Sequence, residues 1–488
     1  MTKLLAGCSD YGKLMLLIGI LVAFPLLVIP FYSSERGFFL PFFIPAAFSM
    51  LSGLLLCIFG KKEESGCLER QSLLKTSSIT VLFTWAWGIF IGAMPFILSG
   101  QLVPVQAVFE SISGWTTAGL SVMDVQALPK IMLFHRSFMQ YCGGLGFVVM
   151  MVMLISGRQS MDLFNAEGHP DKLKPNLKKT AQTIFFIYNG FLVAGTFSLF
   201  LLGMNFFESL CHAMCALSTG GFSTRANSIG EFGSLPVEMV TVLLMLVGST
   251  NFAVLLLALR GKLRQVIKVS EVRFFAVLLL GLIPVTALSI SAGNGLGTGF
   301  RHAVFNIVSA LSTAGFSTVN LADWPPFALG IMILVMLMGG GIGSTAGGIK
   351  LTRIYLMFRI AALNLKKKLL PPRSVDVSYY MKAQGRIKLD EGVVYDAAGF
   401  VIFYIGIFIA GSLAMMVTEG CGLTEAMFEF ASALGTVGLS IGITGTATRS
   451  PTLIVEMIGM ILGRLEIFIV LIGFCSSVKV MKERFARG

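Results

Sequence analysis

Long runs of apolar residues alternate along the whole chain with short polar segments. Ten of these runs are long enough to cross about 30 Å of hydrocarbon as helices rising about 1.5 Å per residue. They cover residues 14–33, 38–60, 77–99, 130–155, 181–203, 236–259, 274–293, 327–348, 394–417 and 452–478. The pattern therefore predicts an all-α polytopic membrane protein with ten crossings.

Four shorter apolar stretches lie between spans three and four, five and six, seven and eight, and nine and ten. They share one pattern over residues 109–121, 211–223, 305–317 and 428–440, and each ends in Thr-x-Gly, then Leu or Phe, then Ser. Stretches of this length are too short to cross a bilayer, so they are predicted to enter the membrane and return on the same side.

Two further positions keep the same register in the four stretches. Each glycine is preceded by a polar residue nine positions earlier and by a small residue six positions earlier: Glu110, His212, Asn306 and Glu429, then Ser113, Cys215, Ser309 and Ser432. One match would be typical of ordinary small-residue packing between membrane helices. Four matches in one register indicate an internal repeat with a common function.

Non-helical backbone is tolerated at membrane depth only where protein buries it or where it lines a watery cavity. Four equivalent loops can meet this condition around one axis, with their carbonyl oxygens pointing inward. Such oxygens can replace the hydration shell of a potassium ion. Glycine allows backbone conformations that place successive carbonyls on one side, and each preceding helix would point its partly negative end at the ion. The loops therefore predict a central pore for a monovalent cation, with potassium favoured.

Composition supports a membrane as the solvent of this 488-residue chain. Its mean hydropathy is +0.83, and only 13% of its residues are charged, where a soluble domain carries about 25%. The formal charge of +12 does not indicate nucleic-acid binding, because the basic residues lie in short segments between apolar runs.

The distribution of Lys and Arg predicts the orientation. Of the 37 basic residues, 30 fall on one side of the predicted membrane: at the N-terminus, in 61–75, 158–179, 260–273 and 350–388, and after 478. Cytoplasmic segments carry such an excess of positive charge. Both termini are therefore predicted to face the cytoplasm, and the four loops to enter from outside.

The four-loop pattern resembles the membrane subunit of the Trk/Ktr/HKT superfamily of potassium transporters, over nearly the whole chain. Two extra N-terminal spans resemble the Trk branch. The resemblance implies an N-terminal two-helix extension, residues 1–76, and four pseudo-symmetric helix, pore-loop, helix repeats around one pore: residues 77–160, 161–265, 266–390 and 391–488. It also implies a cell inner membrane location, a bound potassium ion as cargo and no covalently bound cofactor.

In that family the loop glycines determine selectivity, and they correspond to Gly119, Gly221, Gly315 and Gly438. Members with four glycines favour potassium, whereas a serine in the first loop goes with sodium. The loops differ from the Thr-Val-Gly-Tyr-Gly signature of tetrameric potassium channels. The expected potassium-binding residues are Thr117, Ala118, Gly119, Thr219, Gly220, Gly221, Thr313, Ala314, Gly315, Thr436, Val437 and Gly438.

A glycine-rich run in the eighth span cannot stay a regular helix, because glycine destabilises helix interiors. Its residues include Gly339, Gly340, Gly341, Gly343, Ser344, Thr345, Gly347 and Gly348. Close helix packing through small residues is one interpretation. The resemblance implies another, in which this segment is a flexible intramembrane loop that gates the pore below the filter.

Arg464 lies near the centre of the last predicted span, where a lipid-facing charge would cost at least about 3 kcal/mol. It is therefore expected to face the protein interior. An ion pair between two helices is one interpretation, although Glu466 is no natural partner because residues two apart point to different helix faces. The resemblance implies instead that the arginine projects into the pore beneath the filter, as part of the closed gate.

Other polar residues at membrane depth are given structural roles. Glu110 and Glu429 are expected to bond the backbone of their own loops rather than to concentrate cations. His135, His212 and His302 are expected to be hydrogen-bonded helix residues rather than ligands or proton relays.

The segment 350–390 is the longest and most basic of the cytoplasmic segments. Charge that sets topology and attracts anionic lipid headgroups would explain it. The resemblance implies in addition that a cytosolic ring of nucleotide-binding regulatory subunits docks on this face, and that two copies of the chain form a homodimer with one pore each.

Three functions are compared. The first is a gated, passive potassium pore, the second a potassium symporter coupled to protons or sodium, and the third an intramembrane enzyme. Few carboxylates and no evident proton relay lie in the spans, which favours the first over the second. No paired Asp, Ser/His or His/Glu/His arrangement lies at their depth, so an enzyme is not expected.

Overall fold

The computed structural model describes residues 8–59, 70–146, 177–369 and 378–485. Within these ranges helices dominate, and one short β-hairpin accompanies them. Residues 147–155 of the fourth predicted span lie outside the described residues, as do most of the basic segments 61–75 and 158–179.

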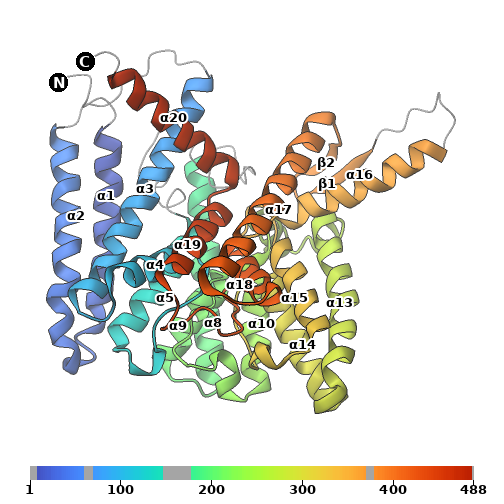
Figure 1. Ribbon diagram of the computed structural model, residues 1–488, viewed down its shortest axis with the longest axis horizontal. Helices are drawn as coiled ribbons and strands as arrows, with labels where there is room; N and C mark the ends of the chain where they lie inside the picture. The colour runs from blue at the N-terminus through green and yellow to red at the C-terminus, as the bar shows by residue number, and fades with distance from the viewer. Residues whose placement is uncertain (1–7, 60–69, 147–176, 370–377, 486–488) are drawn as a thin grey trace.

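The first two helices form an antiparallel pair at one edge of the molecule (Figure 1). Helix α1 (Cys8–Ala23) and helix α2 (Phe39–Phe59) are joined by two short 3₁₀ helices, η1 (Phe24–Val28) and η2 (Ser33–Phe38). Gly12 and Gly53 lie so close that a β-carbon on either would overlap the carbonyl oxygen of the other. Such close backbone approach through small residues is how membrane helices pack.

The same order of elements then occurs four times: a long helix, a short helix, a loop and a second helix. The long helices are α3 (Arg70–Leu98), α8 (Leu177–Leu201), α13 (Ser270–Asn294) and α17 (Glu391–Glu419). The short helices are α4 (Pro104–Trp115), α9 (Phe206–Leu217), α14 (Leu296–Leu311) and α18 (Leu423–Gly435). The second helices are α5 (Lys130–Leu145), α10 (Leu235–Ser249), α15 (Pro326–Met338) and α19 (Ser450–Arg464).

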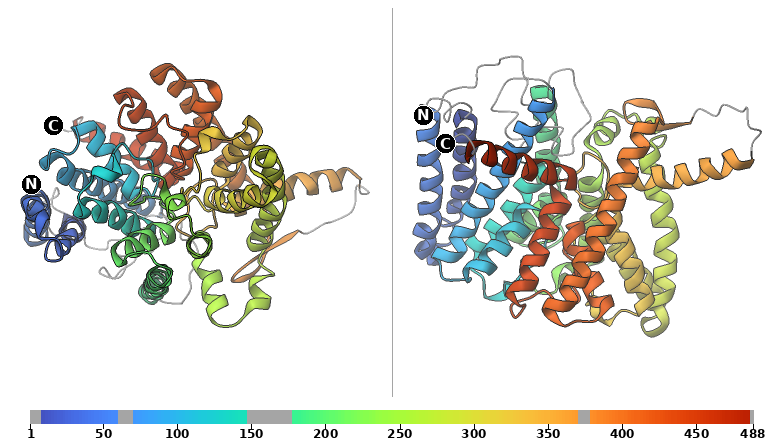
Figure 2. Two further views of the ribbon diagram at one scale, coloured as in Figure 1. Left: turned by 90° about the horizontal axis from the view of Figure 1, so that it is seen from below. Right: turned by 45° about the horizontal axis from the view of Figure 1, so that its top comes forward.

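Seen along the axis of the bundle, these four groups follow one another around the centre, from cyan through green and yellow to red (Figure 2, left). Two large clusters of buried apolar side chains hold them together, one among α3, α4, α5, α8 and α9 and the other among α14, α15, α17 and α18. Short 3₁₀ turns precede three of the second helices: η3 (Val125–Ala127), η4 (Ser228–Phe232) and η5 (Leu321–Asp323). The short helix α12 (Leu263–Val266) precedes α13 and connects the second group to the third.

The second helices share a glycine close to their C-terminal ends. A glycine stands thirteen residues after the first residue of each: Gly143, Gly248, Gly339 and Gly463. At three of them a β-carbon would overlap the carbonyl oxygen of the last residue or the next-to-last residue of the preceding short helix: Trp115, Leu217 and Leu434. A side chain at these positions would therefore push the second helix off the short one.

At or beyond this glycine α10, α15 and α19 break. Helix α10 meets α11 (Phe252–Leu259) at 115°, and α19 meets α20 (Ile467–Phe485) at 103°. The predicted spans 236–259 and 452–478 are therefore each bent, and each is a single crossing only if the bent pair is one span. Non-helical backbone separates α15 from α16 (Leu351–Leu369), which confirms the predicted break in the eighth span.

Six described helices are long and apolar enough to cross a membrane, or eight if each bent pair is one span. The remaining two predicted spans, 130–155 and 327–348, begin as the 16-residue α5 and the 13-residue α15. Six to eight apolar helices make this a multi-pass membrane fold, while the number ten stays a prediction.

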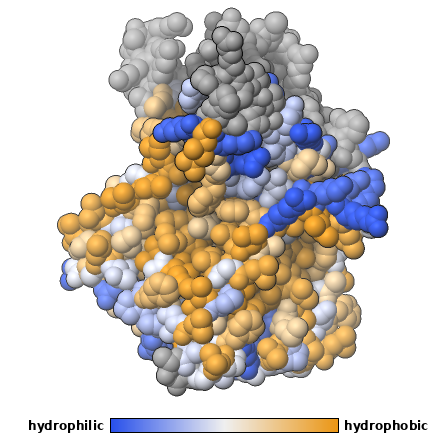
Figure 3. All heavy atoms as spheres, turned by 90° about the vertical axis from the view of Figure 1, so that its right-hand side faces the viewer, coloured by the Kyte–Doolittle hydropathy of each residue, from blue (hydrophilic) through white to orange (hydrophobic). Residues whose placement is uncertain are grey.

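A β-hairpin interrupts the predicted all-α segment 350–390. Strand β1 (Tyr379–Lys382) pairs antiparallel with β2 (Gly385–Lys388), and the Met381 N–H donates to Ser270 Oγ at 3.0 Å, which fixes the hairpin to α13. Helix α16 projects beside it as an arm (Figure 2, right). Hydrophilic residues gather along the arm, above a broad hydrophobic surface (Figure 3).

Candidate ion-binding loops and gate

The four loops that follow the short helices meet in the interior of the bundle. Each loop glycine abuts a carbonyl oxygen of another loop so closely that a β-carbon would overlap it: Gly119 abuts Gly220, Gly221 abuts Ala314, Gly315 abuts Val437, and Gly438 abuts Ala118. These contacts run from the first loop through the second, third and fourth and back to the first. The twelve residues predicted to bind potassium are therefore brought together in one closed ring.

The backbone of each loop alternates in handedness. The threonines have φ between 49° and 57°, the glycines two residues later have φ between 72° and 97°, and the residue between them keeps a negative φ. Alternation of this kind points successive like groups of the backbone to one side. The geometry thus fits a ring of converging carbonyl oxygens.

The short helices end in the same way in all four copies. The N–H groups of Ala118, Gly220, Ala314 and Val437 each donate at 2.9 Å to the carbonyl five residues earlier. The preceding threonine N–H donates to the carbonyl three residues before it at 3.1 to 3.2 Å. This is the Schellman helix ending, with threonine in the left-handed position. Each helix therefore directs its partly negative C-terminal end toward the ring.

Threonine is an unusual choice for the left-handed position. Its branched side chain makes positive φ cost on the order of 1–3 kcal/mol, whereas glycine would adopt it freely. All four threonines are fully buried. The hydroxyl oxygens of Thr117 and Thr436 have no hydrogen-bond partner. Two buried, unpaired oxygens facing the loop region are what a bound cation would satisfy.

A polar residue on each short helix anchors the outer end of its loop. Glu110 accepts from the Ser121 hydroxyl at 3.1 Å and the Val122 N–H at 3.2 Å. Glu429 accepts from the Ser440 hydroxyl at 2.6 Å and the Ile441 N–H at 2.9 Å. The predicted bonding of both glutamates to their own loops is confirmed.

The other two copies use neutral anchors. His212 Nε2 lies 2.9 Å from Ser223 Oγ, and Asn306 donates to Thr318 Oγ1 at 3.0 Å. His302 Nδ1 lies 2.9 Å from the same Thr318 oxygen, and His135 Nε2 lies 3.1 Å from the Gly92 carbonyl. The three histidines are hydrogen-bonded helix residues, as predicted.

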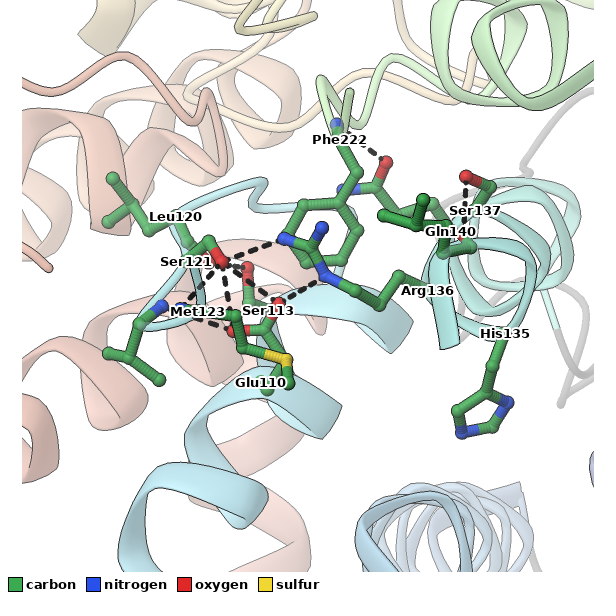
Figure 4. Close-up of polar contacts among 12 residues, drawn as sticks. Glu110, Ser113, Leu120, Ser121, Met123, His135, Arg136, Ser137, Gln140 and Phe222 are labelled. Atoms are coloured by element: carbon green, nitrogen blue, oxygen red, sulfur yellow. Dashed lines mark hydrogen bonds and ion pairs between the residues drawn. The ribbon is translucent and has the colours of Figure 1, made fainter. Parts of the chain in front are cut away.

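A buried ion pair supports the first loop (Figure 4). Arg136, which is 1% exposed, donates from Nε to Glu110 at 2.5 Å and from its second terminal nitrogen to Ser121 Oγ at 2.7 Å. Its guanidinium carbon lies 4.0 Å from the centre of the Phe222 ring in the second loop. One side chain of α5 therefore holds two adjacent loops.

Gln140, one turn further along α5, makes a second link between copies (Figure 4). Its amide nitrogen donates to the Gly220 carbonyl at 2.6 Å, and its oxygen accepts from the Phe222 N–H at 3.0 Å. Sequence reasoning missed this residue. The available signal was an amide within a predicted membrane span, four residues after Arg136 and so on the same face of the helix.

The glycine-rich segment 339–350 lies directly against the ring. The Thr345 hydroxyl is within 3.2 Å of Thr219 Oγ1 and 2.9 Å of the Gly248 carbonyl, and the Gly347 N–H donates to Thr313 Oγ1 at 2.9 Å. A β-carbon on Gly347 would overlap Thr436 Oγ1. The segment thus contacts the threonines of the second, third and fourth loops.

Arg464 reaches across the bundle at the same level. Its guanidinium donates to the Thr345 carbonyl, to the Gly143 carbonyl at 2.6 Å and to the Gly144 carbonyl at 3.2 Å. It therefore ties the glycine-rich segment to the last turn of α5. Glu466 pairs with Arg353 at 2.6 Å instead, which confirms that it is not the partner of Arg464.

Comparison with known proteins identifies the family. The family model TrkH, described as a cation transport protein, matches residues 49–482. The chain belongs to the TrkH family of cation transport proteins. It is 31% identical over 481 residues to the Trk system potassium uptake protein TrkH of Escherichia coli K12, which covers 95% of this chain and 96% of that protein.

Two further relatives agree over nearly the full length. The Trk system potassium uptake protein TrkH of Halomonas elongata is 29% identical over 478 residues, with 95% of this chain and 96% of that protein covered. The crystal structure of the potassium transporter TrkH from Vibrio parahaemolyticus matches with a TM-score of 0.82 at 29% identity, covering 95% of this chain and 97% of that one. The chain is thus a multi-pass membrane transport protein of largely helical fold.

The donor set of the ring differs from a site for a transition metal. Within the described ranges, no group of three or more His, Cys, Asp or Glu side chains is arranged to hold a metal ion. The groups that converge are neutral backbone and hydroxyl oxygens, which suit a weakly held, hard cation.

Removing Arg136 should destabilise the protein strongly, because Glu110 would be left as an unpaired buried charge. Loss of one partner of such a pair costs about 3–5 kcal/mol. Arg136→Gln should therefore lower the thermal unfolding temperature of the detergent-solubilised protein, and Glu110→Gln combined with Arg136→Gln should recover part of the loss.

The matched control is Arg225→Gln. Arg225 is 41% exposed and pairs with Glu208 at 2.7 Å, and exposed pairs contribute about 0–1 kcal/mol. Equal unfolding temperatures for Arg136→Gln and Arg225→Gln would contradict the assigned support role.

Proposed function

We propose that the chain takes up potassium ions across the cytoplasmic membrane, through the ring of four loops. The observation that carries the proposal is the closed contact of Gly119, Gly221, Gly315 and Gly438 with the neighbouring loops. The relatives named as potassium uptake proteins support potassium as the cargo.

In this proposal the carbonyls of the loops act as the selectivity filter. Thr117 to Gly119, Thr219 to Gly221, Thr313 to Gly315 and Thr436 to Gly438 supply oxygens that replace the water shell of the ion. The C-terminal ends of four helices add negative potential without placing a full charge in the path. Neutral ligands bind the ion weakly enough to let it leave again.

Residues 339–348 and Arg464 form the gate in the same proposal. The hydrogen bonds of Thr345 and Gly347 to the filter threonines support a segment seated beneath the ring. A guanidinium at this level adds a positive charge that repels an approaching cation. Opening would then require both the segment and the arginine to move aside.

The proposed topology has both termini in the cytoplasm and the loops entering from outside, within four repeats at 77–160, 161–265, 266–390 and 391–488 that follow the 1–76 extension. The start of α1 and the end of α20 lie at the same end of the molecule (Figure 1), which supports termini on one side. Helix α16 and its basic neighbours would then lie at the cytoplasmic surface.

The regulator and the oligomer are part of the proposal as well. A cytosolic nucleotide-binding ring would dock on the cytoplasmic face that carries α16, and two copies of the chain would associate with one pore each. The names of the relatives, which refer to a Trk system, support further components.

Expression of the chain should let a bacterial strain without potassium uptake systems grow on low-potassium medium. Purified protein in liposomes should then conduct potassium down a voltage gradient alone, because the proposed pore needs no coupling ion. Growth and radioisotope uptake measure the two steps. Failure of both would overturn the function, and uptake only when a proton or sodium gradient is imposed would show a symporter.

Replacing a loop glycine by serine should reduce selectivity for potassium over sodium. Gly438→Ser adds a side chain at a positive φ of 97° and against the Ala118 carbonyl. We expect at least about a tenfold loss of preference, equal to about 1.4 kcal/mol. Competition between potassium and sodium in liposome flux measures the ratio.

The control for this change is Gly281→Ser on α13, where a β-carbon would meet nothing within 4 Å. It should leave selectivity unchanged. If serine at all four loop glycines also leaves the ion preference unchanged, the ring is not the filter.

Arg464→Gln should raise potassium flux through the reconstituted protein. The change removes a positive charge at the gate and weakens the bridge between the Thr345 and Gly143 carbonyls. An increase on the order of tenfold needs only about 1.4 kcal/mol from the barrier. Arg449→Gln, a change of the same charge at an exposed position, is the control, and equal flux in both variants would count against the gate.

A further inference from the structure

The anchor of the fourth loop faces a second glutamate. Glu429 on α18 and Glu456 on α19 are both fully buried, and the Thr444 hydroxyl lies between them. Thr444 Oγ1 is 3.0 Å from Glu429 Oε2 and 2.6 Å from Glu456 Oε1. Neither glutamate makes an ion pair in the described part of the chain.

Counting hydrogens assigns the protonation of this pair. A threonine hydroxyl carries one hydrogen and can donate it to only one of the two carboxyl groups. A 2.6 Å contact between two oxygens without a hydrogen between them would be repulsive. One of the two acids must therefore carry a proton and donate it to Thr444.

The surroundings show which acid holds the proton. Glu429 Oε1 accepts from the Ser440 hydroxyl and from the Ile441 and Ile443 N–H groups at 2.6, 2.9 and 3.2 Å. These donors stabilise an ionised carboxylate. Glu456 has no such donors, and its Oε2 is buried without a partner. An unpaired neutral oxygen costs far less in a protein interior than an unpaired charge.

The register of the first copy gives an independent argument. Glu456 is six residues after the first residue of α19, and Arg136 is six residues after the first residue of α5. Arg136 faces Glu110, which is the counterpart of Glu429. The position that supplies a cation opposite the first carboxylate thus supplies an acid opposite the fourth. An acid can face the Glu429 carboxylate without placing two negative charges together only if it is protonated.

We propose that Glu456 is a proton-binding site that holds the fourth loop in place through Thr444 and Glu429. The effect of this proton on potassium flux rests on the proposed function, whereas the binding of the proton by Glu456 does not. When the proton leaves, two carboxylates compete for the single hydrogen of the Thr444 hydroxyl, and their charges repel each other, which weakens the link between Glu429 and Thr444. The anchoring of Ser440 and Ile441 then weakens, and so does the ring.

The other charged groups around Glu456 do not supply a counter-ion. Glu419 at the end of α17 is the further acid that faces it, and Glu419 accepts from the Thr452 hydroxyl at 2.7 Å. Three further acids of this region have partners of their own: Glu110 pairs with Arg136, Glu466 pairs with Arg353, and Glu425 accepts from the Gly422 N–H. The Arg449 side chain donates to the Thr418 carbonyl.

Infrared spectroscopy of the full-length protein in lipid nanodiscs tests the proton directly. The difference spectrum between wild type and Glu456→Gln at neutral pH should contain the carbonyl stretch of a protonated carboxyl group. Glu419→Gln, which removes a neighbouring acid, should leave that band in place. If wild type has no band that depends on Glu456, the site is not a proton site.

The pH dependence of stability and flux tests the coupling. The folded protein holds a proton that the unfolded chain would release at neutral pH, so stability should fall as pH rises. Potassium flux in liposomes should fall severalfold over the same alkaline range. Glu456→Gln, whose amide can still donate to Thr444, should flatten both profiles, and Glu419→Gln should keep them. Unchanged profiles in Glu456→Gln would overturn the coupling.

A second pair of variants covers the case in which Glu456→Gln does not fold. Thr444→Ser keeps the shared hydroxyl and should preserve the infrared band, whereas Thr444→Val removes it and should shift the band. Identical bands in the two variants would overturn the shared hydrogen bond. A protein with the band but without potassium flux would contradict the proposed function and leave the proton site standing.

Discussion

Backbone polar groups inside a membrane must find partners, and the four loops meet this constraint at the centre of the molecule. Every loop uses the same helix ending, with the middle residue donating at 2.9 Å to its own helix. The N–H groups of the threonine and of the middle residue are thereby satisfied, and the carbonyl oxygen of each middle residue lies against the glycine of a neighbouring loop. Oxygens gathered at this depth need partners such as water or a cation, because unpaired polar groups are costly away from water.

The four loops have the same backbone conformation, but they differ in their anchor residues and in the partners of their threonine hydroxyls. The second and third loops have neutral anchors, His212 and Asn306, and their threonine hydroxyls contact the glycine-rich segment. The first and fourth loops have carboxylate anchors, and their threonine hydroxyls have no partner. The glycine-rich segment is therefore hydrogen-bonded to the threonines of the second and third loops, while the carboxylate anchors belong to the first and fourth loops.

The sequence predicts the short helices and loops well because four copies in one register are unlike any chance pattern. It also predicts the break in the eighth span, because many glycines make a helix impossible there. The bends near Asn251 and Glu466 were missed, since hydropathy measures how apolar a window is and not its direction. Glycines at a fixed distance from each helix start, such as Gly248 and Gly463, were the available signal.

Long-range partners could not be predicted at all. Gln140 and Glu456 are polar residues in helices of predicted spans, and their roles depend on groups 80 and 12 positions away. The hairpin at Tyr379–Lys388 was missed for a different reason. Its strands are four residues long and lie in a segment whose strong positive charge dominated the interpretation.

The anchor residue of each loop and the residue that faces it from the second helix differ in charge from copy to copy. The four anchors are Glu110, His212, Asn306 and Glu429, and the residues six positions into the facing helices are Arg136, Thr241, Met332 and Glu456. The first pair balances a negative charge with a positive one, and the next two pairs are neutral. The fourth pair keeps one negative charge only if Glu456 holds a proton. In that case the single uncompensated carboxylate is Glu429, and its charge is held by the Ser440 hydroxyl and the Ile441 N–H of its own loop, as the charge of Glu110 is held by Arg136.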